Sequence, residues 1–434
     1  MHHPPALFCR APDVSGLRDP STRRAVKQVI VIGAGAAGTM AAIFAARAGA
    51  QTTLLERTKD GGRKILISGG GRCNVLPSRV DESRFVTASS PNILRKIIRS
   101  WPLAEQIRFF EHELGIPLEL EEESLKLFPA SHKARDVRDG LLAAAARAGV
   151  RLVTETSVSD VRPDDQGWLV LADDGQEFRA HAAIIATGGL SVPNTGSDGR
   201  GLSVLRQLGH TMHPTYAALT PLTVEPGDFT ELAGISLPLT LSARSGSDTA
   251  TATGGFLFTH RGYSGPSVLN VSHVAVRARA TSGERTTLTV KWTPLGDEEW
   301  NERLQPQGAR TVSGAVRAEL PERLASVLIA RAGVDPLRPL SDLRREERLR
   351  LVGMLVRGEL PWAGDEGYKK AEVTGGGVSL SEINARTMES RKHPGLFICG
   401  EVLDAFGPIG GYNFLWAWAT GRAAGIGAAA HPDG

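Results

Sequence analysis

The chain has 434 residues, which is too long for one ordinary domain, so we expect two or three domains with ample cores. The formal net charge is +3 and only 6% of the residues are aromatic, so stacking surfaces for nucleic acid are scarce. Three cysteines without a CxxC pair argue against a disulfide framework or a zinc site. The sequence contains no run of about 18 apolar residues that could cross a bilayer. We therefore expect a cytoplasmic protein with no metal site, no membrane association and no nucleic-acid partner, and the oligomeric state stays open.

The first 24 residues differ from the rest of the chain. They hold a short apolar stretch, Ala6–Cys9, with prolines on both sides, and they lack the apolar middle of a signal peptide. We expect residues 1–24 to form a disordered extension.

A βαβ unit opens the folded part of the chain. Val29–Ile32 is wholly apolar, which is the pattern of a strand buried on both faces of a parallel sheet. An alanine-rich helix follows and ends near Gly49, and a second strand at 52–55 ends in Glu56. The GxGxxG spacing between the first strand and the helix indicates a dinucleotide-binding unit in this context.

The three fingerprint glycines have separate expected tasks. Gly33 makes the tight turn, Gly35 lets the backbone approach a diphosphate, and Gly38 permits close packing of the helix. The diphosphate is expected at the helix N-terminus, because free N–H groups and the positive end of the helix dipole favour an anion there. Glu56 is placed to accept hydrogen bonds from a ribose hydroxyl group.

Such a fingerprint binds either a nicotinamide dinucleotide or FAD, and three features favour FAD. Alternating runs between residues 151 and 179 predict an antiparallel meander, and a buried strand at 183–186 follows it. A buried strand at 395–401 ends in Gly400 and Glu401, which can reach the far end of an extended cofactor. Asn413 is the expected N-cap of a helix, whose N-terminus would stabilise negative charge on a reduced flavin by on the order of 0.3–2 kcal/mol.

The stretch Gly62–Asn74, GRKILISGGGRCN, contains three consecutive glycines, which let a backbone pass beside a flat ring. Arg72 could neutralise phosphate or flavin charge, or it could form an ordinary surface ion pair. Asn74 is expected to hydrogen-bond ring or ribityl oxygens. We interpret Cys73 as a small buried hydrophobic residue without a redox role.

Five motifs make the chain resemble the RsdA/BaiN/AoA(So)-like flavoproteins, whose relatives are FAD-dependent oxidoreductases. The resemblance spans roughly Val29 to Ile426 and rests on GRKILISGGGRCN, FTHRGYSGP, VTGGGV, TMES and GLFICGEVLDAFGPIGGYNFLWAWATG. It implies that Gly69–Asn74 lies against the flavin and that Val158 contacts the adenine through its backbone. One departure is Leu415, which occupies a place where the family usually has glutamine.

The resemblance also implies a fold that agrees with the changes in residue composition along the chain. We predict an α/β protein with an FAD-binding Rossmann-like domain of the two-dinucleotide-fold, glutathione-reductase type, formed by residues 25–209 and 368–434. An insert at 210–367 interrupts it, with a β-barrel at about 210–295 and a helical part at about 296–360. The insert is rich in Thr, Ser and Gly at first and then in charged helical patterns.

These arguments assign a set of residues to the cofactor site. The predicted cofactor-binding residues are Gly33, Gly35, Ala36, Ala37, Gly38, Glu56, Arg57, Arg63, Lys64, Gly69, Gly70, Gly71, Arg72, Cys73, Asn74, Val158, Thr187, Gly188, Gly189, Gly400, Glu401, Gly410, Gly411, Tyr412 and Asn413. His260, on a loop of the insert, is the candidate catalytic acid, although such a histidine can equally hold a loop.

The expected function is that of an FAD-dependent oxidoreductase that exchanges hydride or electrons with a small organic substrate between the flavin domain and the insert. The resemblance suggests enone reduction or oxidation of a small amine such as aminoacetone. The sequence lacks a second βαβ fingerprint, so NAD(P)H would bind transiently at the substrate face, or electrons would pass to oxygen or a carrier. Two alternatives stay open: a flavoprotein that acts as an RNA- or protein-binding adaptor through its insert, and an NAD-binding dehydrogenase.

Overall fold

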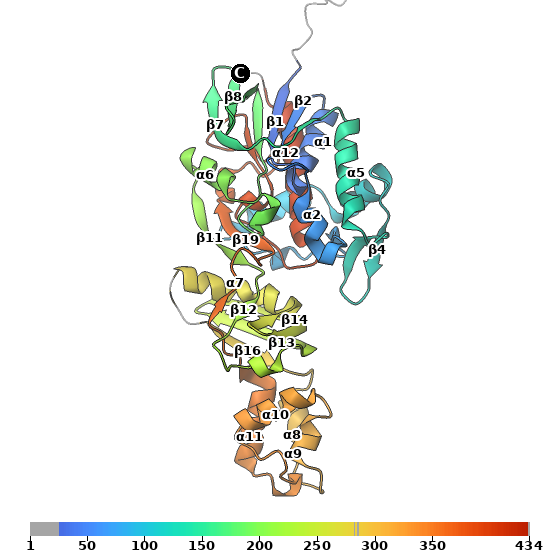
Figure 1. Cartoon of the computed structure of the whole chain (residues 1–434), viewed down its shortest axis with the longest axis vertical. Helices are drawn as coiled ribbons and strands as arrows, with labels where there is room; N and C mark the ends of the chain where they lie inside the picture. Colours follow the sequence, from blue (N-terminus) through green and yellow to red (C-terminus); the bar gives the residue numbers. More distant parts are fainter. Residues whose placement is uncertain (1–25, 282, 284–285, 433–434) are drawn as a thin grey trace, which may run out of the picture.

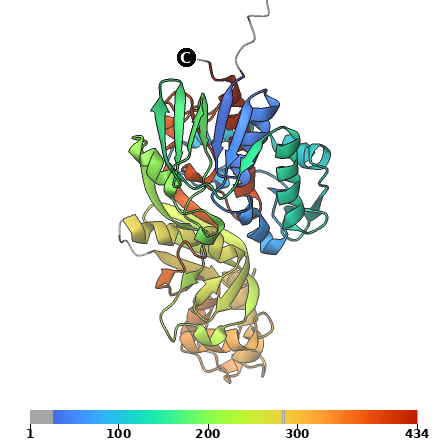
Figure 2. The same ribbon diagram turned by 45° about the horizontal axis from the view of Figure 1, so that its top comes forward.

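In the computed structural model, residues 26–281, 283 and 286–432 are described, and the expectation for residues 1–24 lies outside them. Figure 1 shows a parallel sheet and its helices at the top, a second sheet with α7 (Pro266–Thr281) below it, and a group of helices at the bottom. The turned view in Figure 2 keeps the same order. None of the helices in the described part has the length and apolarity needed to cross a membrane.

A five-stranded parallel sheet forms the centre of the upper part. In spatial order its strands are β20 (Leu396–Ile398), β10 (Ala182–Ile185), β1 (Gln28–Ile32), β2 (Gln51–Leu55) and β6 (Arg151–Val153). Four of the five β1 residues are buried, as a parallel strand covered on both faces requires. The predicted βαβ unit is confirmed.

Two helices from opposite ends of the chain pack together beside this sheet, α1 (Ala36–Arg47) and α12 (Tyr412–Ala430). A Cβ atom at Gly421 would lie 2.3 Å from the Ala37 carbonyl oxygen, and one at Gly425 would lie 2.2 Å from that of Ala41. Only glycine permits this approach. It brings the C-terminal helix against the fingerprint helix.

Further elements surround the central sheet. The helical ones are α2 (Arg63–Ile67), η2 (Ser68–Gly71), η3 (Glu82–Arg84), α3 (Pro91–Arg99), α4 (Leu103–Arg108), η4 (Phe109–Glu113), α5 (Ala134–Arg147), η5 (Pro193–Thr195), α6 (Arg200–Gln207), η8 (Leu380–Glu382) and η9 (Gly400–Val402). The strands form one sheet of β3 (Leu76–Pro77), β5 (Lys126–Pro129) and β4 (Leu118–Glu121), and another of β7 (Val158–Asp164), β8 (Gly167–Ala172) and β9 (Glu177–Ala180). The latter is the predicted meander, except that residues 151–153 belong to the parallel sheet.

The insert is built on a seven-stranded antiparallel sheet that packs against α7. In spatial order the strands are β17 (Gly358–Glu359), β16 (Thr287–Lys291), β13 (Ser236–Ser245), β14 (Asp248–Thr259), β15 (Gly262–Ser264), β12 (Leu222–Thr223) and β18 (Gly364–Asp365). The first and last strands of this order are not paired with each other in the described residues, so the sheet is not a barrel closed by strand pairing. The helix α7 was not predicted, and it lies within the region expected to be β structure.

Beyond this sheet lie the helical elements of the insert. They are η6 (Thr230–Leu232), α8 (Asp297–Arg303), α9 (Val312–Val316), α10 (Glu322–Arg331), η7 (Leu340–Asp342) and α11 (Arg345–Arg357). Two antiparallel strands, β11 (Met212–Ala218) and β19 (Val373–Val378), lead into and out of the insert. The buried residues form two hydrophobic clusters, one mostly of the upper part and one mostly of the insert. The exact domain boundaries stay a prediction.

Candidate cofactor site

A cavity of about 330 Å³ opens at the carboxyl ends of the parallel strands, which is where ligands bind in open α/β sheets. Ile32 and Leu55, the last residues of β1 and β2, line it. So do the glycine loops at 69–70 and 410–411, and Leu219 and Leu269 of the insert. The loops predicted to cup one extended ligand therefore meet in one continuous space.

The three fingerprint glycines differ in what surrounds them. A Cβ atom at Gly33, where φ is +101°, would lie 2.7 Å from the Ala186 carbonyl oxygen, and one at Gly38 would lie 1.8 Å from the Gly33 carbonyl oxygen. At Gly35, the N-cap of α1, no atom lies within 4 Å of such a Cβ. Gly33 and Gly38 are therefore needed by the fold, whereas Gly35 presents bare backbone to the cavity.

Glu56 lies at the cavity, but its carboxylate already has protein partners. One oxygen accepts the backbone N–H of Ala34 at 2.9 Å, and the other accepts the N–H of Thr58 at 2.8 Å and its hydroxyl at 2.7 Å. A carboxylate has about four acceptor positions, so room for a ribose hydroxyl remains. These bonds fix the side chain at the end of β2.

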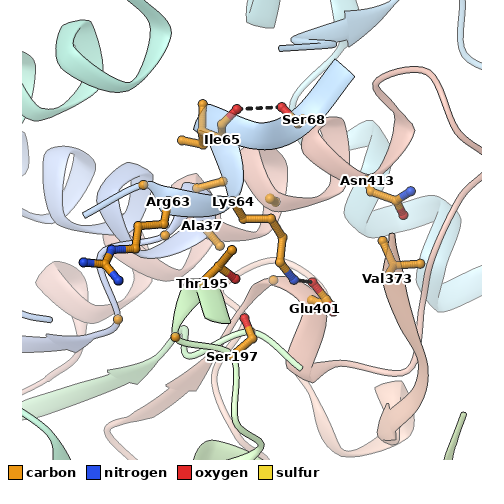
Figure 3. A pocket seen from close by; sticks show the side chains of 18 of the residues that line it. Ala37, Arg63, Lys64, Ile65, Ser68, Thr195, Ser197, Val373, Glu401 and Asn413 are labelled. Atoms are coloured by element: carbon orange, nitrogen blue, oxygen red, sulfur yellow. Dashed lines mark hydrogen bonds and ion pairs between the residues drawn. The ribbon is translucent and has the colours of Figure 1, made fainter. Parts of the chain in front are cut away.

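Lys64 and Glu401 form an ion pair across the cavity, with Nζ and Oε2 2.8 Å apart (Figure 3). Ser191 donates to the other carboxylate oxygen at 2.6 Å, and the Thr374 N–H donates to it at 3.0 Å. Burial acts to raise the pKa of Glu401, but the Lys64 ammonium and the hydrogen bonds hold it below its usual value. Glu401 is therefore an ionised carboxylate with fixed partners.

The two neighbouring arginines also line the cavity, and both have carboxylate partners. Arg63 Nε lies 2.8 Å from an Asp60 oxygen, and Arg57 pairs with Asp198. Val158, at the start of β7, lines the same end of the cavity. Each of the two arginines is therefore already paired with one carboxylate.

The glycine run bends sharply beside the cavity. Gly69, Gly70 and Gly71 have φ values of +56°, +68° and +87°, a conformation that other residues rarely adopt. A Cβ at Gly69 would lie 2.8 Å from Oδ1 of Asn74, and at Gly70 it would meet nothing. Within the described residues the buried Asn74 Oδ1 has no hydrogen-bond donor, although Asn74 lines the cavity. A bound group that donates a hydrogen bond would satisfy it.

Arg72 and Cys73 do not line the cavity, which corrects the prediction for both. The bend of the glycine run turns Arg72 away, so that its guanidinium lies 2.8 Å from Glu121 and 4.2 Å from the centre of the Phe128 ring. Of the two alternatives that the sequence left open for Arg72, the structure shows the surface ion pair. Cys73 is fully buried, and burial raises its thiol pKa to about 12, which disfavours the reactive thiolate.

Asn413 lines the cavity but is not an N-cap, contrary to the sequence prediction. The helix α12 begins two residues earlier than predicted, with Gly411 as its N-cap at φ +92°. The Asn413 amide instead accepts the N–H of Gly407 at 2.9 Å and donates to its carbonyl oxygen at 3.0 Å. It therefore holds the loop at 407–411 against the helix start.

Four other predicted residues also lie outside the lining. Gly38 and Gly189 pack against backbone and side chains beneath it, and Gly71 lies in the bend of the glycine run. The Tyr412 hydroxyl donates to the Arg79 carbonyl oxygen at 3.2 Å. The lining includes the remaining predicted cofactor residues: Gly33, Gly35, Ala36, Ala37, Glu56, Arg57, Arg63, Lys64, Gly69, Gly70, Asn74, Val158, Thr187, Gly188, Gly400, Glu401, Gly410, Gly411 and Asn413.

His260, the predicted catalytic acid, does not line this cavity, so the structure does not bring it together with the predicted cofactor residues. It lies in the exposed turn between β14 and β15, where a hairpin turns its side chains to solvent. Glu372, which was not among the predicted site residues, lines the cavity and directly precedes the VTGGGV motif. Among the described residues, no cluster of His, Cys, Asp and Glu could hold a metal ion.

The lining residues fit FAD. A cavity that runs from the bare backbone of Gly35 to the unpartnered Asn74 Oδ1 offers a place for a diphosphate and a hydrogen-bond acceptor for a ring or ribityl donor. The Thr187 hydroxyl, also in the lining, is a second buried polar group without a partner in the described residues. When bound, FAD would supply the hydride or electron chemistry.

The Rossmann-like fold and this cavity define a flavin-dependent oxidoreductase. A family model described as the HI0933-like protein Rossmann domain matches residues 27–427. The chain belongs to this HI0933-like family, which is consistent with the resemblance seen in its motifs.

Curated relatives are similar over nearly their whole length. The chain is 33% identical to the ribosomal RNA dihydrouridine synthase of Escherichia coli, over 90% of this chain and 95% of that protein. It is 31% identical to the 3-dehydro-bile acid delta(4,6)-reductase of Clostridium scindens, over 94% and 100%. Among solved structures, the 3-ketosteroid delta1-dehydrogenase of Sterolibacterium denitrificans has a TM-score of 0.51 and 12% identity, over 94% of this chain and 100% of that chain. This last likeness concerns the fold alone.

Proposed function

We propose that the protein uses FAD to reduce a carbon–carbon double bond that is conjugated to a carbonyl group. The observation that carries this proposal is the cavity, whose lining combines the predicted cofactor residues with apolar side chains. The apolar lining residues include Ile67, Leu219, Leu269, Ile409 and Phe414, of which Leu219 and Leu269 belong to the insert. An apolar wall excludes water from a hydride acceptor and suits a hydrophobic ring.

The names of two relatives support the same bond type. A delta(4,6)-reductase of a 3-dehydro-bile acid acts on double bonds conjugated to a ketone, and dihydrouridine differs from uridine by saturation of the double bond conjugated to a ring carbonyl. Both reactions need a hydride at one carbon and a proton at its neighbour. We propose a small apolar enone as the substrate, because the wall beside the insert is apolar. A uridine in ribosomal RNA is the second candidate, favoured by the name of the Escherichia coli relative.

In this proposal the chain positions the cofactor and the substrate. Gly33, Gly35 and the N-terminus of α1 hold the diphosphate, Asn74 accepts a hydrogen bond from the ring or ribityl part, and the Lys64–Glu401 pair lies in the cavity wall between them. NAD(P)H would reduce the cofactor transiently from the open side of the cavity, because the sequence offers no second dinucleotide fingerprint.

The test separates the two half-reactions. The purified protein with FAD is mixed anaerobically with NADPH or NADH, and flavin bleaching is followed. The reduced protein is then mixed with 4-androstene-3,17-dione or with ribosomal RNA that lacks dihydrouridine, and return of the flavin absorbance is recorded. Reoxidation by either substrate supports the proposal and identifies the class. Bleaching of the oxidised protein by aminoacetone, with no reoxidation by either acceptor, would instead establish an amine oxidase.

A further inference from the structure

Glu372 lies where the chain returns from the insert to the cofactor domain. It directly precedes β19, and its backbone N–H donates to the carbonyl oxygen of Leu219 at 3.1 Å. Leu219 and Val373, its partner and its neighbour, both line the cavity, as Glu372 itself does. The residue is therefore held in the cavity lining beside Leu219, an apolar lining residue of the insert.

The carboxyl group of Glu372 is available to a ligand. Glu372 is an exposed residue that lines the cavity. Within the described ranges no hydrogen bond or ion pair engages its carboxylate oxygens, whereas both oxygens of Glu56 and both oxygens of Glu401 in the same cavity have protein partners. Of the three glutamates in the cavity lining, Glu372 is the one free to exchange a proton.

The charges around Glu372 keep its acid form accessible. Burial raises the pKa of Glu372, and the two cations that act on it, Lys64 and Lys126, offset this only in part. Lys64 is committed to Glu401, and burial lowers the pKa of Lys126. The pKa values of Glu372 and Glu401 thus move in opposite directions, which is how paired carboxyl groups take separate roles at one site.

We infer that Glu372 is the proton donor of the reaction, an assignment that rests on the proposed reduction of a conjugated double bond. As hydride from the reduced cofactor forms a C–H bond at the β-carbon, the π bond breaks and its electron pair moves toward the α-carbon and the carbonyl oxygen. The Glu372 carboxyl group gives its proton to the α-carbon and becomes a carboxylate. Water then returns the proton to Glu372.

The first test uses Glu372→Gln, which keeps the shape of the side chain but removes the acid. Flavin bleaching by NADPH should keep its wild-type rate, while reoxidation by the enone or the RNA should slow by roughly 10²-fold or more. The wild-type rate of reoxidation should fall as pH rises through the pKa of Glu372, and the variant should lack this fall. Glu372→Asp, which retains an acid, should recover part of the rate. Glu123→Gln, in the exposed β4–β5 turn, is the matched control.

The outcomes separate this inference from the proposed function. If wild-type protein is reoxidised by neither substrate, the proposed function fails. If wild type is reoxidised and Glu372→Gln is reoxidised equally fast with the same pH profile, the function stands and the role of Glu372 is refuted.

A second readout does not depend on activity. Because the folded-state pKa of Glu372 is raised, its ionisation destabilises the folded state as pH rises from the ordinary value of 4.5 through the raised one. The full-length Glu372→Gln protein should therefore match wild type in melting temperature near pH 4 and exceed it near pH 8, with or without FAD. A difference independent of pH would show that the environment of Glu372 is not the one argued above.

Discussion

Substitution of Gly35 by alanine should separate cofactor binding from folding. Gly35 has φ −77° and ψ −169°, an extended conformation open to any residue, and no atom lies within 4 Å of an added Cβ. Loss of a glycine at an N-cap is then the main folding cost, on the order of a few tenths of a kcal/mol to about 1 kcal/mol. The added methyl group would occupy the face that a diphosphate must approach, so FAD affinity should fall tenfold or more, or about 1.4 kcal/mol.

The matched comparison is Gly38→Ala. Its Cβ would lie 1.8 Å from the Gly33 carbonyl oxygen, so the turn or the helix must move, at a cost of roughly 1–3 kcal/mol. Urea unfolding of both FAD-free proteins gives their stability, and quenching of FAD fluorescence on titration gives their affinity. Gly35→Ala should unfold close to wild type and bind FAD poorly, and Gly38→Ala should be destabilised. A Gly35→Ala protein that binds FAD as tightly as wild type would refute the placement of the diphosphate.

Three further substitutions test the contacts of the cavity. Lys64→Met leaves the Glu401 carboxylate without its cationic partner. Because the pair is partly open to the cavity, the substitution should lower the free energy of unfolding by about 2 kcal/mol at neutral pH. The ion pair stabilises the wild-type protein above the ordinary glutamate pKa, and this stabilisation is lost as pH falls through the lowered pKa of Glu401. The melting temperatures of wild type and Lys64→Met should therefore converge in acid. A difference in melting temperature that stays constant with pH would contradict the pairing. His260→Ala, in an exposed turn, should change the free energy of unfolding by no more than about 0.5 kcal/mol and should leave turnover unchanged. A selective loss of kcat would support the predicted catalytic role of His260. Asn413→Ala removes two hydrogen bonds to Gly407, so it should lower the free energy of unfolding by roughly 1–2 kcal/mol and weaken FAD binding. Urea unfolding measures the first effect and FAD titration measures the second. An unchanged FAD affinity would mean that the loop at 407–411 does not contact the cofactor.

Local patterns in the sequence were enough to predict the structural features that depend on residues close together in the chain. The apolar run before Gly33, the glycine spacing and the return strand fix a parallel βαβ unit, because each follows from the period and turn chemistry of a short segment. The meander was predicted for the same reason, and so was the return of the chain to the first domain after the insert.

Side-chain direction was decided by contacts between distant segments. The helix α12 starts two residues earlier than predicted, so that Gly411 is the N-cap and Asn413 hydrogen-bonds to the loop before it. The left-handed glycines after Ser68 sent Arg72 toward Glu121, which no spacing within that stretch predicts.

The sequence by itself determined the class of cofactor domain and the position of the glycine turn predicted to hold the diphosphate, since both depend on glycines and strands that are adjacent in the chain. Only the tertiary structure decided which charged groups are free. Glu401 meets Lys64 across more than three hundred residues, and Glu372 is left without such a partner. The physical reason is that the charge state of a carboxyl group depends on burial and on neighbours in space, and the chain order specifies neither.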